Sequence, residues 1–241
     1  MRTQIIDFSD RKTPVVFPNE RSNLAQAISE LGLKDRYPAI VLIGGEIDGQ
    51  QAVVTQRAIE AIARAAADLR AVLICGGTDM GIIAQIGQIR WRHGYKFPLI
   101  GVTPEQLVTW PGGPHNTKFL WLGKQRWQLE SHHSHFILVP GSQFGDESLW
   151  MGDVATLLSK GYQSVTILIN GGDVSRKEIE LSLENSRPVI VLSRTGRLAD
   201  ELARQPVRDK LITVVPAQAE QRIVEAIQSA LAMTEKSEAG I

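Results

Sequence analysis

The sequence is poor in cysteine, in long apolar runs and in charge of one sign. Its single cysteine, Cys75, rules out an intramolecular disulfide and is typical of a reducing compartment. Because Cys75 lies in an apolar run with no histidine or lysine nearby in sequence, we expect a buried structural thiol. No apolar run approaches the roughly 20 residues of a transmembrane helix, and the first residues lack a signal-peptide core. We therefore expect a cytoplasmic protein.

The charged residues do not indicate a nucleic-acid partner. The 26 lysine and arginine residues balance 26 aspartate and glutamate residues, so the formal net charge is +0. Proteins that rely on phosphate contacts with DNA or RNA carry clustered basic residues. We expect neither nucleic acid nor a membrane as a partner.

What the sequence does contain is a repeated apolar run that ends in glycine. Four such runs occupy residues 39–45, 72–77, 136–141 and 165–172, and a helix-like stretch follows each. Each run is long enough for a strand buried on both faces, which is typical of a parallel sheet. Glycine at the end of a strand permits a sharp turn and lets a ligand approach the backbone. The pattern predicts a Rossmann-like sheet with a ligand at its carboxyl edge.

The alternation of strands and helices predicts an α/β fold with a mostly parallel sheet of about seven strands and helices on both faces. The expected strands are 39–44, 72–75, 97–103, 135–139, 164–169, 188–192 and 211–215. Residues 1–38 are expected to form a lead-in with one short helix, and an insert at about 104–134 is expected to contain a β-hairpin around 123–125. We expect one domain, residues 1–233, and a disordered polar tail, residues 234–241.

The glycine loops supply the candidate ligand site, because a helix N-terminus presents free N–H groups and a partial positive charge to phosphate. The motif at residues 76–81 has glycine at three of its positions, more than a helix cap alone requires, although a cap without ligand is the alternative. Glu46 in the first loop would repel a bare phosphate, so it suits ribose hydroxyls, a base edge or a metal, or else belongs to a polar loop. Arg197 offers a guanidinium to phosphate, with an ordinary surface arginine as the alternative.

Two loops have structural alternatives that depend on helix capping. Ser175 and Glu178 have the spacing of a capping box, and this role is our preferred interpretation for both. Asp146 and Glu147 occupy a first helical turn, where the helix dipole favours acidic residues whatever their function.

The candidate ligand-binding residues come from five loops. They are Gly44, Gly45, Glu46, Gly76, Gly77, Thr78, Asp79, Gly81, Gly141, Ser142, Gly145, Gly171, Gly172, Ser175, Thr195, Gly196 and Arg197.

Three histidines near the end of the insert do not predict a metal site. His133 and His135 should share one face of a strand, with His132 pointing away, and no cysteine or HExxH partner accompanies them. We expect no metal.

These motifs together resemble the SLOG/LSDAT superfamily, which includes Smf/DprA, the Lonely Guy proteins and the N-terminal region of melastatin-type TRP channels. The resemblance is strongest to the stand-alone prokaryotic relatives of that channel region. It rests on segments 39–45, 76–87, 133–139, 165–172 and 195–200, which occur in the family's order. It implies a modified Rossmann fold that senses nucleotide-derived ligands, in particular ADP-ribose-like molecules, without a required cofactor.

The Lonely Guy branch of this superfamily implies an enzyme instead. Its loop, Pro-Gly-Gly-x-Gly-Thr-x-x-Glu, corresponds here to residues 170–178. Asn170 replaces the proline, Val174 the third glycine and Ser175 the threonine. The glutamate is kept as Glu178, which is therefore the one candidate catalytic residue. Our preferred hypothesis is a ligand sensor that acts through self-association or an effector protein, and the alternative is an N-glycosidase of a nucleotide or NAD-like substrate.

Overall fold

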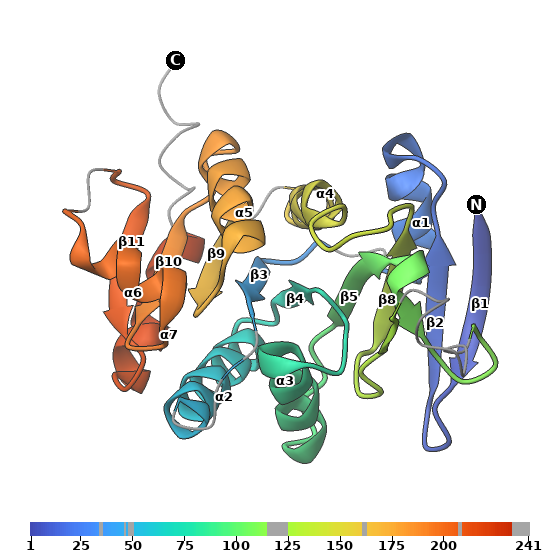
Figure 1. The fold of residues 1–241 in the computed structure, drawn as a ribbon, viewed down its shortest axis with the longest axis horizontal. Helices are drawn as coiled ribbons and strands as arrows, with labels where there is room; N and C mark the ends of the chain where they lie inside the picture. Colours follow the sequence, from blue (N-terminus) through green and yellow to red (C-terminus); the bar gives the residue numbers. More distant parts are fainter. Residues whose placement is uncertain are drawn as a thin grey trace.

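A nine-stranded sheet forms the centre of the molecule (Figure 1). The computed structural model describes residues 1–33, 36–45, 47, 51–114, 125–160, 163–206 and 209–232. The strands in spatial order are β1 (Arg2–Asp7), β2 (Lys12–Phe17), β8 (His135–Val139), β5 (Leu99–Pro104), β4 (Val72–Cys75), β3 (Ala39–Gly44), β9 (Ser164–Ile169), β10 (Val189–Ser193) and β11 (Ile212–Pro216). Only the β1–β2 pair is antiparallel, so the expected parallel α/β fold is confirmed.

All seven expected strands are present, and the two additional ones lie in the lead-in. β1 and β2 form a hairpin, and β2 pairs in parallel with β8 at the edge of the sheet. Ser9 makes the turn with a φ of 68°. The expected short helix appears as α1 (Leu24–Glu30), preceded by the 3₁₀ turn η1 (Arg21–Asn23).

Helices cover both faces of the sheet. One face carries α2 (Ala52–Asp68), α3 (Gly81–Arg92) and α7 (Glu220–Ala232), and the other carries α1, α4 (Ser148–Leu158), α5 (Asp173–Glu184) and α6 (Arg197–Arg204). Alternate residues of each central strand enter the two apolar cores: Ile40 and Leu42 pack under α2, whereas Val41 and Ile43 pack under α4 and α5. This two-sided burial explains why the central strands are predominantly apolar on both faces.

The insert completes the core where no long helix packs. Its short strands β6 (Val108–Thr109) and β7 (Trp127–Gln128) follow the 3₁₀ turn η2 (Glu105–Leu107) and pair with each other in parallel. Trp110 and Leu129 from the insert pack with Phe136 and strands β1 and β2 in a third apolar cluster. The first half of the predicted hairpin falls mostly on residues 115–124, outside the described residues, and β7 takes β6 as its partner.

The chain reverses its direction of travel across the sheet between β3 and β9. From β3 it moves outward through β4, β5 and β8, and then returns to place β9 against the other side of β3. At such a switch point the loops after the two strands run to opposite faces, which opens a crevice at the carboxyl edge.

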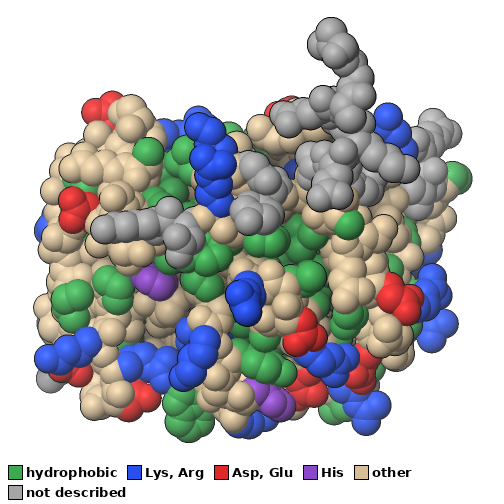
Figure 2. Space-filling view, turned by 180° about the vertical axis from the view of Figure 1, so that it is seen from behind, with side chains coloured by type: hydrophobic (Ala, Val, Ile, Leu, Met, Phe, Trp, Pro, Cys, Tyr) green, Lys and Arg blue, Asp and Glu red, His purple; other side chains and the backbone are tan. Residues whose placement is uncertain are grey.

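Within the described part of the chain, no helix has the length and apolar character to cross a membrane. The tail that we expect to be disordered lies outside the described residues. On the face seen in Figure 2, lysine and arginine side chains are dispersed among acidic and uncharged ones.

Candidate functional site

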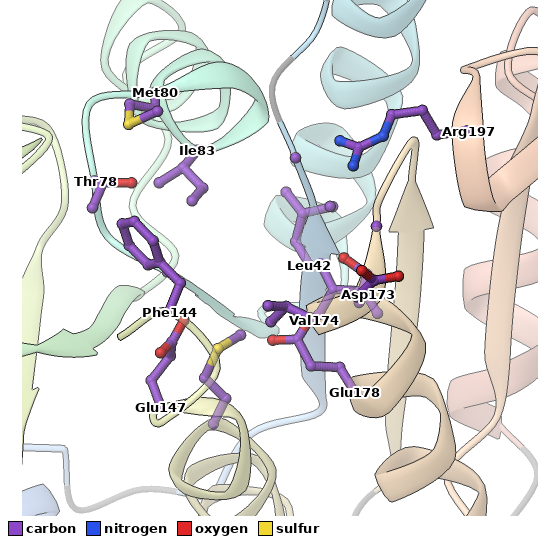
Figure 3. A pocket seen from close by; sticks show the side chains of 17 residues that line it. Leu42, Thr78, Met80, Ile83, Phe144, Glu147, Asp173, Val174, Glu178 and Arg197 are labelled. Atoms are coloured by element: carbon purple, nitrogen blue, oxygen red, sulfur yellow. The ribbon is translucent and has the colours of Figure 1, made fainter. Parts of the chain in front are cut away.

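A cavity of about 380 Å³ lies at the carboxyl edge, at the switch point (Figure 3). Five strand-to-helix connections contribute to its wall, those that follow β3, β4, β8, β9 and β10. The lining residues are Leu42, Ile43, Gly44, Gly45, Gly76, Thr78, Met80, Ile83, Phe144, Glu147, Met151, Gly172, Asp173, Val174, Ser175, Glu178 and Arg197.

The cavity brings together about half of the residues selected from the sequence. Those in its lining are Gly44, Gly45, Gly76, Thr78, Gly172, Ser175, Glu178 and Arg197. Those outside its lining are Gly77, Asp79, Gly81, Gly141, Ser142, Gly145, Gly171, Thr195 and Gly196. Glu46 lies outside the described residues. Participation of any of these residues in ligand binding stays a prediction.

Arg197 places its guanidinium between two glycines. A Cβ on Gly172 would lie 2.5 Å from Nη2, and a Cβ on Gly45 would lie 3.3 Å from Nη1, so both glycines make room for it. Arg197 is exposed and has a φ of 45°, which a residue with a side chain rarely adopts. Among the described residues, no carboxylate forms an ion pair with it.

The loop before Arg197 holds its own polar groups internally. The Thr195 hydroxyl accepts the Asn170 N–H at 2.8 Å and donates to the Leu192 carbonyl at 2.7 Å. Asp200 accepts the N–H groups of Arg194 and Gly196. Thr195 is fully buried, so its position indicates that it fixes the loop from which Arg197 projects.

Glu178 does not form the capping box that its spacing with Ser175 predicts. Gly172 is the N-cap residue of α5, which begins at Asp173, so Ser175 is the third helical residue and Glu178 lies in the second turn. Glu178 instead lines the cavity and accepts a hydrogen bond from the Ser148 hydroxyl on α4 at 3.3 Å. Burial raises the pKa of Glu178 to about 8, with a further contribution from the charge of Glu147.

Glu147 is a site residue that sequence reasoning assigned to helix stabilisation. Its half-buried neighbour Asp146 also precedes α4, which begins at Ser148, and accepts the N–H groups of Ser142 and Gln143 in the preceding loop. Glu147 is only 6% exposed, accepts the Gly145 N–H at 2.8 Å and lines the cavity. Burial raises its pKa to about 7. Adjacent acidic residues at a helix start gave no signal of which one turns inward.

The glycine motif after β4 is shaped by internal packing as well as by the cavity. Gly77 has a φ of 75°, and a Cβ there would lie 2.9 Å from the Gly101 Cα and 3.2 Å from the Phe136 ring. Asp79 lines a second cavity, of about 310 Å³, on the insert side of this loop. The loop therefore separates two cavities, with Thr78 facing the first and Asp79 the second.

Cys75 is buried, as expected, but it contacts a histidine that is distant in sequence. Its Sγ lies 3.1 Å from Nε2 of His133, whose Nδ1 lies 2.7 Å from Oε2 of Glu130. His132 also contacts Glu130, through Nδ1 at 2.5 Å. The prediction that His132 points away from His133 is therefore wrong, because both side chains contact the same carboxylate. His135 contacts Ser134 instead.

The charges of this buried cluster compensate one another. Burial alone would raise the pKa of Glu130, but the hydrogen bonds and charges of His133 and His132 hold it below its usual value. Burial alone would lower the pKa of His133, but its contacts with Cys75 and Glu130 raise it to about 9. The Glu130 carboxylate packs directly against Gly87 on α3, where any Cβ would overlap it.

Comparisons with known proteins identify the sequence family and the fold. The model of a family described as "SLOG in TRPM, prokaryote" matches residues 37–235. A search of curated proteins found no match. Among solved structures, the molybdenum cofactor carrier protein from Chlamydomonas reinhardtii is 18% identical, with a TM-score of 0.52 over 81% of this chain and 98% of its own. The molybdenum cofactor binding protein from Rippkaea orientalis is 19% identical, with a TM-score of 0.53 over 80% and 97%.

Proposed function

The chain belongs to the family "SLOG in TRPM, prokaryote", and from this premise we propose that it binds a phosphate-bearing, nucleotide-derived ligand related to ADP-ribose or NAD. The observation that carries the proposal is Arg197, a cation without an ion-pair partner among the described residues, held between two glycines at the mouth of the cavity. Phosphate pairs with a guanidinium through two parallel hydrogen bonds.

The start of α5 also favours a phosphate at the end of the cavity where Arg197 lies. Gly172 begins this helix without a side-chain cap, and residues 172–175 line the cavity beside Arg197. Helix N-terminal N–H groups and the helix dipole favour an anion at this position. Solved relatives named for carrying or binding a molybdenum cofactor are consistent with a small-molecule ligand on this fold.

Binding of ADP-ribose, NAD and AMP tests this proposal. We expect ADP-ribose to raise the melting temperature and to give a calorimetric binding isotherm, because a ligand that binds only the folded state stabilises it. The Arg197→Ala variant should lose about tenfold or more in affinity, since one charge-assisted pair contributes roughly 1.5–3 kcal/mol. Arg194→Ala, an exposed arginine of the same loop outside the cavity lining, is the matched control. No binding of any phosphate-bearing nucleotide at millimolar concentration would refute the proposal.

One observation favours the alternative function, an N-glycosidase. Glu178 lines the cavity, and its side chain does not cap the start of α5, as the capping-box interpretation required. Hydrolysis of NAD would break the ribose–nicotinamide bond, join the water oxygen to the ribose and release nicotinamide with a proton. Release of nicotinamide from NAD or adenine from AMP, abolished in a folded Glu178→Gln variant, would establish this activity. We expect no release.

The remaining parts of the proposal concern the cellular context. We propose that ligand binding is transmitted through self-association or through a partner protein. We propose one of these outputs in the cytoplasm, with no nucleic acid involved. Light scattering with and without ADP-ribose distinguishes ligand-dependent self-association from an output that needs a partner.

A further inference from the structure

The cavity has two chemically opposite ends. Arg197 lies at one end, and the side chains of Glu147, which precedes α4, and of Glu178 on α5 lie at the other (Figure 3). Both glutamates line the cavity, and the charge of Glu147 adds to the raised pKa of Glu178. A ligand that fills the cavity must therefore present phosphate to one end and a complementary group to the other.

The carboxyl end has no cation of its own among the described residues. Neither Glu147 nor Glu178 forms an ion pair there. Arg187, at the start of β10, lies near Glu178 below the cavity floor, but its guanidinium bonds to Ser164, Thr156 and the Gly152 carbonyl.

The other charged groups around the pair do not balance it either. Asp146 from the same loop and Asp173 at the start of α5 are both acidic, and Lys177 acts on Asp146. Asp153 on α4 pairs with Arg21. Glu147 is buried, Glu178 is half-buried, and neither has a cation beside it among the described residues. Their ionised forms are therefore unfavourable in the free protein, and a role in binding explains their presence better than a role in folding.

The walls beside the carboxyl pair are apolar. Met151, Val174 and Phe144 line the cavity, and Val174 lies beside Glu178 and Phe144 beside Glu147 (Figure 3). Trp127 of the insert packs edge-on against Phe144, with ring centroids 4.9 Å apart. Such walls favour a flat ring over a sugar, whose remaining hydroxyls would face side chains unable to bond to them. An aromatic face also attracts a cation.

We propose that the carboxyl end of the cavity binds a planar cationic ring, of the pyridinium type found in oxidised NAD, while Arg197 holds the phosphates. This inference rests on the proposed function and selects within its ligand class, favouring the oxidised dinucleotide over the reduced one and over ADP-ribose. The positive ring compensates the negative charge of the two carboxylates.

Binding of such a ring is linked to proton release. In the free protein the carboxyl groups retain protons in the neutral range, because their pKa values are raised to about 7 and about 8. A bound cation favours their ionised forms, so the protons pass to the buffer and affinity increases as the pH rises from 6 to 8.5. ADP-ribose, which lacks the ring, should show no such increase.

Oxidised NAD, NADH and ADP-ribose form the matched ligand set, since the first two differ mainly in the charge of one ring. We expect calorimetry at pH 8 to give at least tenfold tighter binding of oxidised NAD than of NADH. Titrations in two buffers with different ionisation enthalpies should show protons released at pH 7 with oxidised NAD and not with ADP-ribose.

Two isosteric variants test the assigned residues. Glu147→Gln and Glu178→Gln should each reduce the ratio of NADH to NAD dissociation constants, and the double variant should bring it to within about threefold of one. The ratio is determined within each variant, so a change in affinity that both ligands share does not alter it. Glu180→Gln, an exposed glutamate of α5, is the control and should keep the full ratio.

The outcomes separate this inference from the proposed function. Equal affinities for oxidised NAD and NADH, or tighter binding of ADP-ribose than of oxidised NAD, overturn the cationic-ring inference but leave nucleotide binding intact. A preference for oxidised NAD that persists in the double variant removes the two glutamates from its cause and also overturns it. Failure of all three ligands to bind at 1 mM refutes the proposed function and the inference with it.

Discussion

At the scale of single residues, buried glutamates in this protein fall into two kinds. Glu130 is 1% exposed and has its charge compensated by His132 and His133, with both carboxylate oxygens in contact. Glu147 and Glu178 lack such compensation among the described residues, and burial raises the pKa of each. The first arrangement stabilises the fold, and we propose that a bound ligand accounts for the second.

Replacement of Glu130 by glutamine should therefore destabilise the protein strongly. The substitution leaves two histidines next to a neutral amide in a buried site, and removal of one partner from a buried ion pair costs about 3–5 kcal/mol. Urea unfolding at pH 7 measures this loss. Glu184→Gln, an exposed position at the end of α5, should change stability by less than about 0.5 kcal/mol. A Glu130→Gln protein within about 1 kcal/mol of the parent would show that the cluster is not ionic.

At the scale of elements, apolar runs and their periodicity predicted the strands well, but sequence spacing misplaced the start of α5. The seven central strands are apolar because helices cover both of their faces, so each gave a continuous signal. β1 is antiparallel and largely exposed, so it lacks the continuous apolar run that marks the central strands. A Ser-x-x-Glu spacing also occurs inside α5, where Asp173 already occupies the first turn, so spacing alone misplaced the cap.

The loop after β4 offers a matched pair of substitutions that separates packing from binding. Gly77→Ala should destabilise the protein by about 2 kcal/mol or more, because its positive φ and the nearby Gly101 backbone leave no room for a Cβ. Gly76→Ala should keep stability within about 1 kcal/mol, because its Cβ meets only the flexible end of Ile83, at 3.0 Å.

Ligand binding, in contrast to stability, should depend on Gly76 more directly than on Gly77. Gly76 lines the cavity and Gly77 does not, so Gly76→Ala should weaken ADP-ribose binding while the protein stays folded. Thermal unfolding and calorimetry on both variants measure the two effects. An unchanged affinity in the Gly76→Ala protein would mean that this loop does not approach the ligand.

At the scale of the whole molecule, topology explains why the site was partly predictable. Parallel strands send every carboxyl end to one edge, so glycine loops far apart in sequence had to meet there. Which side chain of each loop turns toward the cavity depends on packing across elements, and sequence spacing does not contain it. Asp79 lines the cavity on the insert side, where the Gln128 carbonyl accepts its N–H, whereas Glu147 lines the first cavity and its neighbour Asp146 does not.

The pH dependence of global stability should report the uncompensated glutamates. A carboxyl group with a raised pKa in the folded state binds its proton more tightly there than in the unfolded chain, so stability falls as the pH rises from about 4.5 through about 8. His133 acts in the same direction but over a higher pH range, because its pKa is raised from its usual value to about 9.

The Glu178→Gln variant removes the contribution of Glu178 and leaves that of His133. We expect this variant to match the parent near pH 5 and to exceed it on the order of 1–3 kcal/mol at pH 8.5 in urea unfolding, with the slope above pH 8 retained. Parallel curves for parent and variant across pH 5–8 would show that Glu178 ionises freely in the folded protein, and its place in a dry, cation-seeking end of the cavity would then have to be abandoned.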